Sequence, residues 1–418
     1  MNPEARAIDP LVRCEAIRSA AAALGPGPLR EDALVRHVHP LFSRVLQRRE
    51  LYLSNHSLGR PLDQTTLDLA EFAGLWTRDM DDAWPAWMDA IDHVRAMVAR
   101  LIGVSRPDAV VPRVSAGQGL RGVLNSLPGV PRVLATRAEF DSVDFILKAY
   151  HARGRAHVTF VELDEQRRVR PERVVEALRA GGKYDLVVVS QVYYSTGQVL
   201  DGLEEIVKAA HVRGTLTLID MYHAMGVVEC AFEALGADFA IGGNYKYTRG
   251  GPGAGWLAVH PRRLNDAPTN APPTLDTGWF AKQDTFGFER PEDPVTSAGG
   301  NAWLECTPAP VLAYQARAGL EFVLAVGVNR LRAYSLEQQE FLALELSRRG
   351  VNLERIDPRG AFLLLPRDDA PGTVSRLKAA GVNTDSRLGC VRLCPDVLNT
   401  REELARAAEI IAQVTSAP

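Results

Sequence analysis

The stretch TLTLIDMYHAMGVVECAFEALGADFAIGGNYKYTRGGPGAGWLAV, residues 215–259, decides the fold that we expect. Its apolar run at 216–219 is typical of a buried strand and ends at Asp220. A second short strand is expected at 238–241, and it leads through two glycines to Lys246. In α/β sheets, ligands bind at the carboxyl ends of the strands, so we place the functional site at these residues.

The residues around Lys246 favour chemistry with pyridoxal 5'-phosphate (PLP). A lysine amine can condense with the aldehyde of PLP, and an aspartate can pair with the pyridinium nitrogen so that the ring accepts electrons. Lys246 stands between Tyr245 and Tyr247, ahead of a glycine-rich turn, and His223 follows three residues after Asp220. A surface lysine or a helix-capping aspartate explains either residue alone, but the combination favours PLP. Residues 250–255 do not fit a dinucleotide fingerprint, because they lead toward an apolar strand and not toward a helix.

The order of these motifs resembles that of kynureninases, within the class V aminotransferase superfamily of type-I-fold PLP enzymes. The shared elements are D-x-x-H-x-x-G at 220–226, D-F-A at 238–240 and a Y-K-Y followed by G-P-G at 245–253. The resemblance covers about residues 50–410. It implies an α/β protein with the type-I PLP-dependent transferase fold, in which a large domain with a mostly parallel sheet precedes a small C-terminal α+β domain.

On this basis we expect three parts: a helical arm at 1–50, a large PLP-binding domain at 51–310, and an interdomain helix with the small domain at 311–418. Alternating apolar runs and amphipathic segments between 110 and 260 predict a largely parallel or mixed sheet covered on both faces. The expected elements are strands at 132–135, 157–161, 186–190, 359–365 and 391–393, and helices at 88–103, 171–180, 203–211, 311–326 and 331–347, with Thr400 capping a last helix.

The composition excludes several classes of protein. With 418 residues and 46% hydrophobic residues, the chain can bury a large core. A net charge of −3 without a basic block makes nucleic acid and anionic membranes poor partners. No apolar run reaches the ~18 residues of a membrane span, and the N-terminus lacks the apolar segment of a secretory signal. Five scattered cysteines indicate a reducing compartment without a disulfide framework, so we expect a cytoplasmic protein, and we expect no metal at Cys390 and Cys394.

The resemblance also implies which residues hold the cofactor. Small residues that open a helix can cradle a phosphate with backbone N–H groups and the helix dipole, which singles out 115–117. Phe140 matches the aromatic residue that stacks on the pyridine ring, and Trp279 matches a tryptophan that reaches the phosphate, often across a dimer interface. The implied cofactor-binding set is Ser115, Ala116, Gly117, Phe140, Ser195, Asp220, His223, Tyr245, Lys246, Trp279 and Thr307, of which Lys246, Asp220 and His223 are the expected catalytic residues.

Two residues are expected to contact an amino acid substrate. Arg392 matches the arginine that binds the substrate α-carboxylate, because a guanidinium fork matches a carboxylate bidentately. Ser57 lies in a loop similar to one near the substrate in kynureninases. The chain departs from the family at His56, where asparagine is usual, and at Asp141 and Val143, where the family has proline and aspartate.

The resemblance therefore implies a homodimeric PLP enzyme that acts on an amino acid, by hydrolytic cleavage of the Cβ–Cγ bond as in kynureninases. One alternative is a β-eliminating C–S lyase or a cysteine desulfurase-like class V enzyme, which in the desulfurase case needs a mobile cysteine. Cys390 is the only plausible position for that thiol. Another alternative is a non-catalytic binding protein with the same fold, against which the intact Asp220, Lys246 and Arg392 argue.

Overall fold

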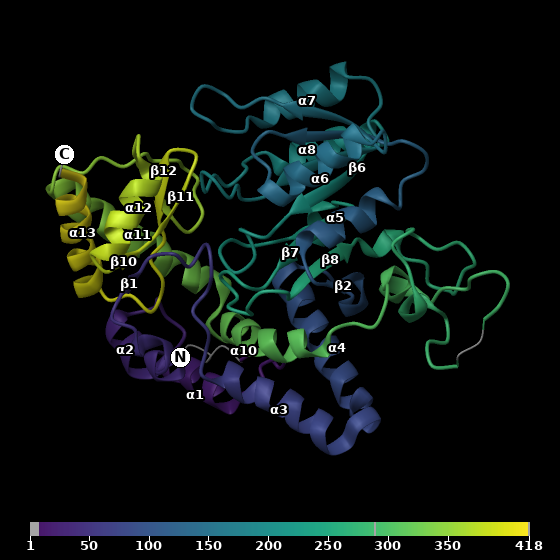
Figure 1. The fold of residues 1–418 in the computed structure, drawn as a ribbon, viewed down its shortest axis with the longest axis horizontal. Helices are drawn as coiled ribbons and strands as arrows, with labels where there is room; N and C mark the ends of the chain where they lie inside the picture. Colours follow the sequence, from purple (N-terminus) through teal and green to yellow (C-terminus); the bar gives the residue numbers. More distant parts are fainter. Residues whose placement is uncertain (1–7, 288–289, 417–418) are drawn as a thin grey trace, which may run out of the picture.

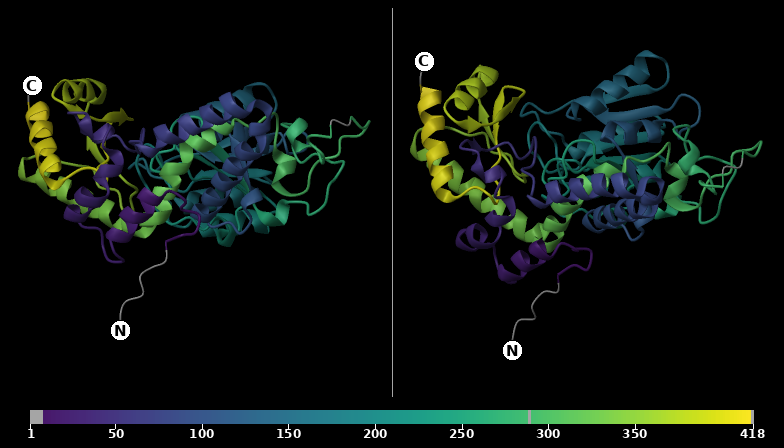
Figure 2. Two further views of the ribbon diagram at one scale, coloured as in Figure 1. Left: turned by 90° about the horizontal axis from the view of Figure 1, so that it is seen from below. Right: turned by 60° about the horizontal axis from the view of Figure 1, so that its bottom comes forward.

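The computed structural model describes residues 8–287 and 290–416. A larger unit surrounds a seven-stranded sheet, and a smaller C-terminal unit lies beside it, with α10 below the large sheet and above α3 in the view of Figure 1. Figure 2 shows the same two units from below and from an oblique angle. Of the N-terminal arm expected at 1–50, residues 1–7 lie outside the described part of the chain.

The helices and strands follow the sequence in the order expected for an α/β protein. The helices are α1 (Glu15–Ala23), α2 (Glu31–His37), α3 (Gln64–Asp79), α4 (Trp84–Ile102), α5 (Ala116–Leu124), α6 (Asp141–Ala152), α7 (Pro171–Ala180), α8 (Leu203–Val212), α9 (Phe232–Leu235), α10 (Pro310–Val326), α11 (Val328–Arg348), α12 (Ala370–Ala379) and α13 (Arg401–Ser416). The strands are β1 (Leu51–Tyr52), β2 (Val110–Arg113), β3 (Arg132–Thr136), β4 (His157–Val161), β5 (Leu186–Ser190), β6 (Leu216–Asp220), β7 (Phe239–Gly243), β8 (Gly255–Val259), β9 (Leu363–Pro366), β10 (Val382–Asn383), β11 (Asp385–Arg387) and β12 (Cys390–Leu393).

The large sheet has the strand order β2-β8-β7-β6-β5-β3-β4. Strands β4, β3, β5, β6 and β7 are parallel, whereas β8 and β2 are each antiparallel to their neighbours in that order. The parallel strands therefore end at one edge of the sheet, where Ser190 pairs with Asp220 and Asp220 with Ile241. The predicted α/β class with a mostly parallel sheet is confirmed.

Burial explains why these segments form strands and helices. All five residues of β5 and all five of β7 are buried, as expected for parallel strands covered on both faces. On α8, the buried residues recur with helical spacing, so one face of the helix packs on the sheet while the other stays in solvent. Those residues are Leu203, Ile206, Val207 and Ala210.

The C-terminal unit has its own sheet, β11-β12-β9, and a separate core formed with α11, α12 and α13. Thr400 caps α13 as expected, because its hydroxyl accepts a hydrogen bond from the N–H of Glu403 at 3.1 Å. Strand β1 pairs in parallel with β10, so residues 51 and 52 belong by hydrogen bonding to the smaller unit and not to the large sheet. The chain thus crosses from the smaller unit into the larger one after β1.

Two expected elements differ in extent. The strand expected at 359–365 forms only at Leu363–Pro366, and Arg359 instead forms an isolated bridge with Gln198 and ion pairs with Asp357 and Glu340. Helix α4 begins at Trp84, earlier than the expected residue 88, since Pro85 fits the first turn of a helix. Within the described residues no single helix could cross a membrane, and only the pair α10 and α11, bent by 85°, passes a test of length and composition.

Candidate active site

Lys246 lies buried at the carboxyl edge of the parallel strands, in a cluster of aromatic rings that we call the pocket. The turn after β7 places it there, with only 5% of its surface exposed. Its Nζ lies 5.1 Å from the ring centre of Tyr222, 5.4 Å from that of Phe140 and 5.5 Å from that of Tyr245. Burial and, after it, the positive charge of Arg392 lower the pKa of Lys246 from 10.5 to about 7, with the charge of Asp220 acting in the opposite direction. The amine therefore loses its proton readily near neutral pH.

His223 and Tyr247 extend from Lys246 in a hydrogen-bonded chain. Nζ of Lys246 lies 2.5 Å from Nε2 of His223, and Nδ1 of His223 lies 3.1 Å from the hydroxyl of Tyr247. Burial lowers the pKa of His223 well below its usual value, so its ring is neutral. A neutral imidazole donates at one nitrogen and accepts at the other, so this chain of hydrogen bonds can hold the amine in a fixed orientation.

Asp220 is a buried carboxylate at the end of β6, and one of its two oxygens is open to a further partner. Its Oδ1 accepts a hydrogen bond of 2.8 Å from the N–H of Tyr222, and Oδ2 has no partner among the described residues. Burial raises the pKa of Asp220 to about 6, while the Tyr222 N–H and the charge of Lys246 act in the opposite direction. The carboxylate is thus ionised at neutral pH and available to a cationic partner.

The loop at 54–61 closes directly over the backbone of Lys246. The N–H of Gly59 donates to the carbonyl of Tyr245 at 2.8 Å. A Cβ at position 59 would lie 1.9 Å from the carbonyl oxygen of Lys246, so only glycine permits this approach. Ser57 is half-buried in the same loop, where its N–H donates to the carbonyl of Ser54 at 2.8 Å.

Arg392 already has an anionic partner within the chain. Its Nε donates to Oδ1 of Asp385 at 2.8 Å, Nη2 donates to Oδ2, and Nη1 donates to the carbonyl of Tyr194 at 2.5 Å. A carboxylate of a substrate would therefore meet the edge formed by Nη1 and Nη2, because Asp385 occupies the other edge. Binding of the substrate α-carboxylate by Arg392 stays a prediction, and its existing bonds limit it to the edge formed by Nη1 and Nη2.

His56 supports Asp385, which explains the departure from the family at that position. Its Nε2 lies 2.6 Å from Oδ1 of Asp385, and the ring is fully buried against Phe362. Burial lowers the pKa of His56 to about 4, followed by the charge of Arg392. Burial opposes the ionisation of Asp385, but hydrogen bonds from His56 and Arg392 outweigh it and hold the pKa of that carboxyl well below its usual range.

The two other departures from the family lie away from Asp220. Asp141 accepts a hydrogen bond of 2.9 Å from the hydroxyl of Tyr194, whereas Val143 is buried in the core under α6. Phe140 is half-buried and meets the ring of Tyr194 edge-on at 5.1 Å. Ser195 is buried in the loop that follows β5. Phe140 therefore shares the pocket with Lys246, while Asp141 faces its rim.

The start of α5 fits an anion. Ser115 caps the helix by accepting the N–H of Gln118 at 3.2 Å, and the N–H groups of Ala116 and Gly117 belong to the first turn, which has no intrahelical acceptors. Gly255 brings β8 against this turn, since a Cβ there would lie 2.9 Å from the backbone of Ser115. A phosphate cradle, a buried lysine amine and an aspartate with an open oxygen are the donor set that PLP needs, so the residues present fit this cofactor.

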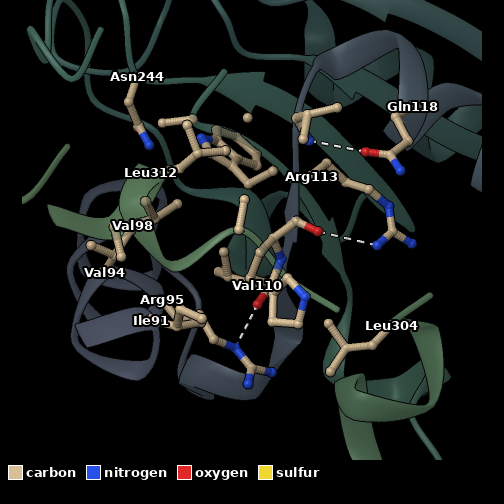
Figure 3. A pocket seen from close by; sticks show the side chains of 18 of the residues that line it. Ile91, Val94, Arg95, Val98, Val110, Arg113, Gln118, Asn244, Leu304 and Leu312 are labelled. Atoms are coloured by element: carbon tan, nitrogen blue, oxygen red, sulfur yellow. Dashed lines mark hydrogen bonds between the residues drawn. The ribbon is translucent and has the colours of Figure 1, made fainter. Parts of the chain in front are cut away.

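Trp279 and Thr307 meet each other and not Lys246. Nε1 of Trp279 donates to the hydroxyl of Thr307 at 3.2 Å, and no interaction among the described residues joins either one to Lys246, His223 or Asp220. Thr307 lines a cavity of about 130 Å³ between α4, β2 and β8, which Figure 3 shows from close by.

Gln118 connects this cavity to the start of α5. Its side chain accepts a hydrogen bond from the N–H of Val114 at 2.9 Å and donates one to Glu305 at 2.8 Å. Figure 3 shows the first of these bonds as a dashed line at Gln118. The segment that carries Thr307 is thereby fastened to the predicted phosphate cradle.

Cys390 does not have the surroundings of a mobile nucleophile. It lies buried on β12, where Nη2 of Arg167 approaches its Sγ at 3.3 Å. Its apolar neighbours belong to a small core that includes Ile356 and Leu364. A thiol fixed on a strand of the smaller unit cannot sweep into the pocket of Lys246 without breaking that sheet.

Sequence reasoning missed several residues of the pocket. Tyr247 and Gly59 belong to motifs in which only neighbouring residues were predicted to act, and Asp385 lies two positions before an exposed arginine on its strand. The carboxylate of Asp396 also escaped notice, although it anchors the turn after Lys246 through a 2.7 Å ion pair with Arg249. The sequence shows these residues but not the distant partners that they meet.

Comparisons with known proteins agree with this architecture. The family model described as aminotransferase class-V matches residues 60–356. A kynureninase of Geobacillus thermodenitrificans (strain NG80-2) is 29% identical over 409 residues, which cover 92% of this chain and 92% of the relative. A kynureninase of Myxococcus xanthus (strain DK1622) is 29% identical over 361 residues, covering 81% of this chain and 83% of the relative.

Among solved structures, an apo cysteine desulfurase from Thermococcus onnurineus NA1 superimposes with a TM-score of 0.78 at 16% identity, covering 91% of this chain and 98% of the other. A variant of C-DES with glycine covalently linked to its PLP cofactor gives a TM-score of 0.77 at 18% identity, covering 90% of this chain and 98% of the other. At these identities the likeness establishes the fold, which is the type-I fold of PLP-dependent enzymes.

Proposed function

The chain belongs to the aminotransferase class-V family, and from that premise we propose that it is a PLP-dependent enzyme that hydrolyses the Cβ–Cγ bond of a kynurenine-like amino acid. The observation that carries the proposal is the buried Lys246 amine, which loses its proton near neutral pH beside His223 and three aromatic rings. An ordinary surface lysine has none of these features. The likeness to kynureninases over nearly the whole chain supports this choice of reaction.

Each residue of the pocket has a task in this proposal. PLP, when bound, supplies an electron sink for the carbanion that forms at Cα of the substrate. Lys246 would hold the cofactor covalently and then move the proton at Cα, while the hydrogen bonds of His223, which Tyr247 in turn orients, would position the lysine amine. Asp220 would hold the proton on the ring nitrogen, because its carboxylate is ionised and has an open oxygen.

Other groups would hold the substrate and protonate it. The Nη1–Nη2 edge of Arg392 would bind the α-carboxylate beside its existing bond to the carbonyl of Tyr194, and the first turn of α5 would bind the phosphate. Burial raises the pKa of Tyr222 and of Tyr245, so both phenols keep their protons at neutral pH and can act as acids toward a carbonyl group of the substrate. The hydrolytic route needs water and no thiol.

A C–S lyase or cysteine desulfurase remains the second candidate, because solved desulfurases share the fold. The buried position of Cys390 beside Arg167 weighs against the desulfurase, which needs a thiol at the substrate. A non-catalytic role is a further alternative, and the intact Lys246 and Asp220 weigh against it.

The deciding experiment offers kynurenine, 3-hydroxykynurenine, cystine and cysteine to the PLP-loaded protein and follows the products by mass spectrometry. We expect alanine and an aryl acid from a kynurenine, from both wild type and Cys390→Ala, and no product from Lys246→Ala. Sulfide released from cysteine by wild type but not by Cys390→Ala, without cleavage of either kynurenine, would establish the desulfurase instead.

We further propose that the protein is a homodimer in a reducing compartment such as the cytoplasm. Its five cysteines are free, as suits that compartment. Trp279 and Thr307 hydrogen-bond to each other, and no interaction in the described part of the chain joins them to Lys246. This arrangement is consistent with both residues contacting the cofactor of a partner subunit. Mixing Lys246→Ala with Trp279→Ala should then restore activity that neither variant has alone.

A further inference from the structure

Glu139 is a buried carboxyl group for which the proposed reaction has no task. It follows β3 and is 3% exposed. The hydroxyl of Thr136 lies 2.5 Å from one of its oxygens, and the hydroxyl of Ser190 lies 2.6 Å from the other. No lysine, arginine or histidine within the described residues hydrogen-bonds to it. A buried carboxylate without a cation is costly, so such a group keeps its proton or has a function that repays that cost.

The position of Glu139 directs it toward Asp220. Ser190, which binds Glu139, is the direct neighbour of Asp220 across the parallel strands β5 and β6. Residues that pair across adjacent strands face the same side of a sheet, so the side chains of Ser190 and Asp220 share one face, and the hydroxyl of Ser190 links that face to Glu139. Burial raises the pKa of Glu139 to about 8; its two hydroxyl partners lower it, and the charge of Asp220 raises it.

Other titratable residues that face this pair include Tyr193, Lys246 and Tyr222. Tyr193 faces Glu139, and burial followed by the charge of Glu139 raises the pKa of its phenol well above the usual value. Lys246 acts on the pair through Asp220, whose pKa it lowers. Tyr222 donates its backbone N–H to Asp220.

The remaining acidic residues of the segment 139–144 are engaged elsewhere. Asp141 binds the phenol of Tyr194, and Asp144 forms an ion pair of 2.6 Å with Lys148 on the outer face of α6. Within this segment, Glu139 is therefore the acidic group that approaches Asp220.

We propose that Glu139 and Asp220, linked through Ser190, form a carboxyl pair that holds one negative charge at neutral pH, with Asp220 as the charged member and Glu139 as the protonated one. This inference rests on the proposed function only in that Asp220 faces the ring nitrogen of PLP. Protons leave such a pair in two steps, here from Asp220 near pH 6 and from Glu139 near pH 8. Above the second step, a second negative charge stabilises any cation held at Asp220.

The apoprotein tests the pair without any cofactor. The pKa of Glu139 is higher in the folded than in the unfolded chain, so its contribution to stability is full below pH 4.5 and is lost as the pH rises to about 8. Glu139→Gln keeps the size and the hydrogen bonds but cannot ionise. Its melting temperature should therefore rise relative to wild type between pH 5 and 8 and level off above that range, whereas the exposed control Glu165→Gln should follow wild type. Parallel profiles for Glu139→Gln and wild type would overturn the proposal.

Infrared spectroscopy of the apoprotein gives a second test that needs no variant at position 139. Wild type should show the band of a protonated, buried carboxylic acid at pH 7 that disappears by pH 9. In Asp220→Asn, the band should disappear at lower pH, because the charge that raises the pKa of Glu139 is gone. A band that titrates identically in both proteins would show two independent carboxyls and refute the pair.

Binding of PLP distinguishes failure of this inference from failure of the proposed function. The ratio of the PLP dissociation constants of Glu139→Gln and wild type should be near unity at pH 7 and rise several-fold by pH 9, since only wild type gains the second charge. A ratio that stays near unity at pH 9 would refute the role of Glu139. If wild type binds no PLP at any pH, the proposed function fails, and the apoprotein profiles still decide the pair.

Discussion

The Lys246 amine should react with aldehydes at neutral pH far faster than any other lysine of the chain. At a pKa of about 7, half of it is neutral at pH 7, whereas an ordinary lysine with a pKa of 10.5 is neutral in about one molecule in 3,000. The expected advantage is therefore about 10³ in the concentration of the reactive form. The shift of about 3.5 pKa units corresponds, at 1.36 kcal/mol per unit, to about 5 kcal/mol in the free energy of protonation of the buried amine.

A labelling experiment measures this advantage directly. Apoprotein is mixed briefly with PLP at pH values from 6 to 9.5, reduced with borohydride and digested, and the pyridoxyl label is counted on each peptide. The exposed Lys208 is the internal control, because its ion pair with Glu204 raises its pKa. The ratio of label on Lys246 to label on Lys208 cancels the titration of the reagent; it should be largest at the acidic end of this range and fall steeply as the pH rises above 7.

The neighbours of Lys246 predict the direction of a further shift. The negative charge of Asp220 raises the pKa of Lys246, so Asp220→Asn should move the labelling midpoint to lower pH. A midpoint above pH 9 in wild type, or an upward shift in Asp220→Asn, would refute the account of the pocket in which burial and Arg392 make the amine neutral.

Three further predictions concern the frame of the pocket. Gly59→Ala should cost at least about 1–3 kcal/mol in urea unfolding, because its Cβ would meet the backbone of Lys246, while Gly74→Ala, where a Cβ meets nothing within 4 Å, should not destabilise; equal midpoints would contradict this. Asp385→Asn should lower the free energy of unfolding by about 3–5 kcal/mol at pH 7, because buried Arg392 loses its anion. The pKa of Asp385 is depressed in the folded state, so its stabilising effect is present above pH 3.8 and declines as the pH falls below that value. A cost of the substitution that grows on acidification would contradict the ion pair. Arg392→Lys should raise KM for every α-amino acid substrate, because a point charge cannot replace the fork, and steady-state kinetics with an unchanged KM would remove Arg392 from substrate binding.

Much of the fold could be predicted because its signals are local. Buried parallel strands read as continuous apolar runs, so β5 and β6 and the residue at the end of β6, Asp220, were placed correctly from the sequence. The helix α6 was not predicted, since its start lies in the segment 139–144, which drew attention as a cofactor motif.

The pocket was harder to predict because its contacts are distant in sequence. The residue-by-residue resemblance named Arg392 but not its partner Asp385, and it treated His56 as a departure beside the substrate although the structure places it behind that ion pair. Glu139 reads as a polar residue before an aromatic one. Only the packing of β3 against β5 shows that it is buried and close to Asp220.

The pairing of β1 with β10 has a consequence for synthesis of the chain. His56 and Asp385 are 329 residues apart, so at about 5–20 residues per second the first waits tens of seconds on the ribosome for the second. Until then β1 has an unpaired edge, the loop that covers Lys246 has no anchor in the smaller unit, and Arg392 does not yet exist. We therefore expect nascent chains to capture PLP only after release, and chaperones that shield edge strands to bind the segment around β1 in the interval.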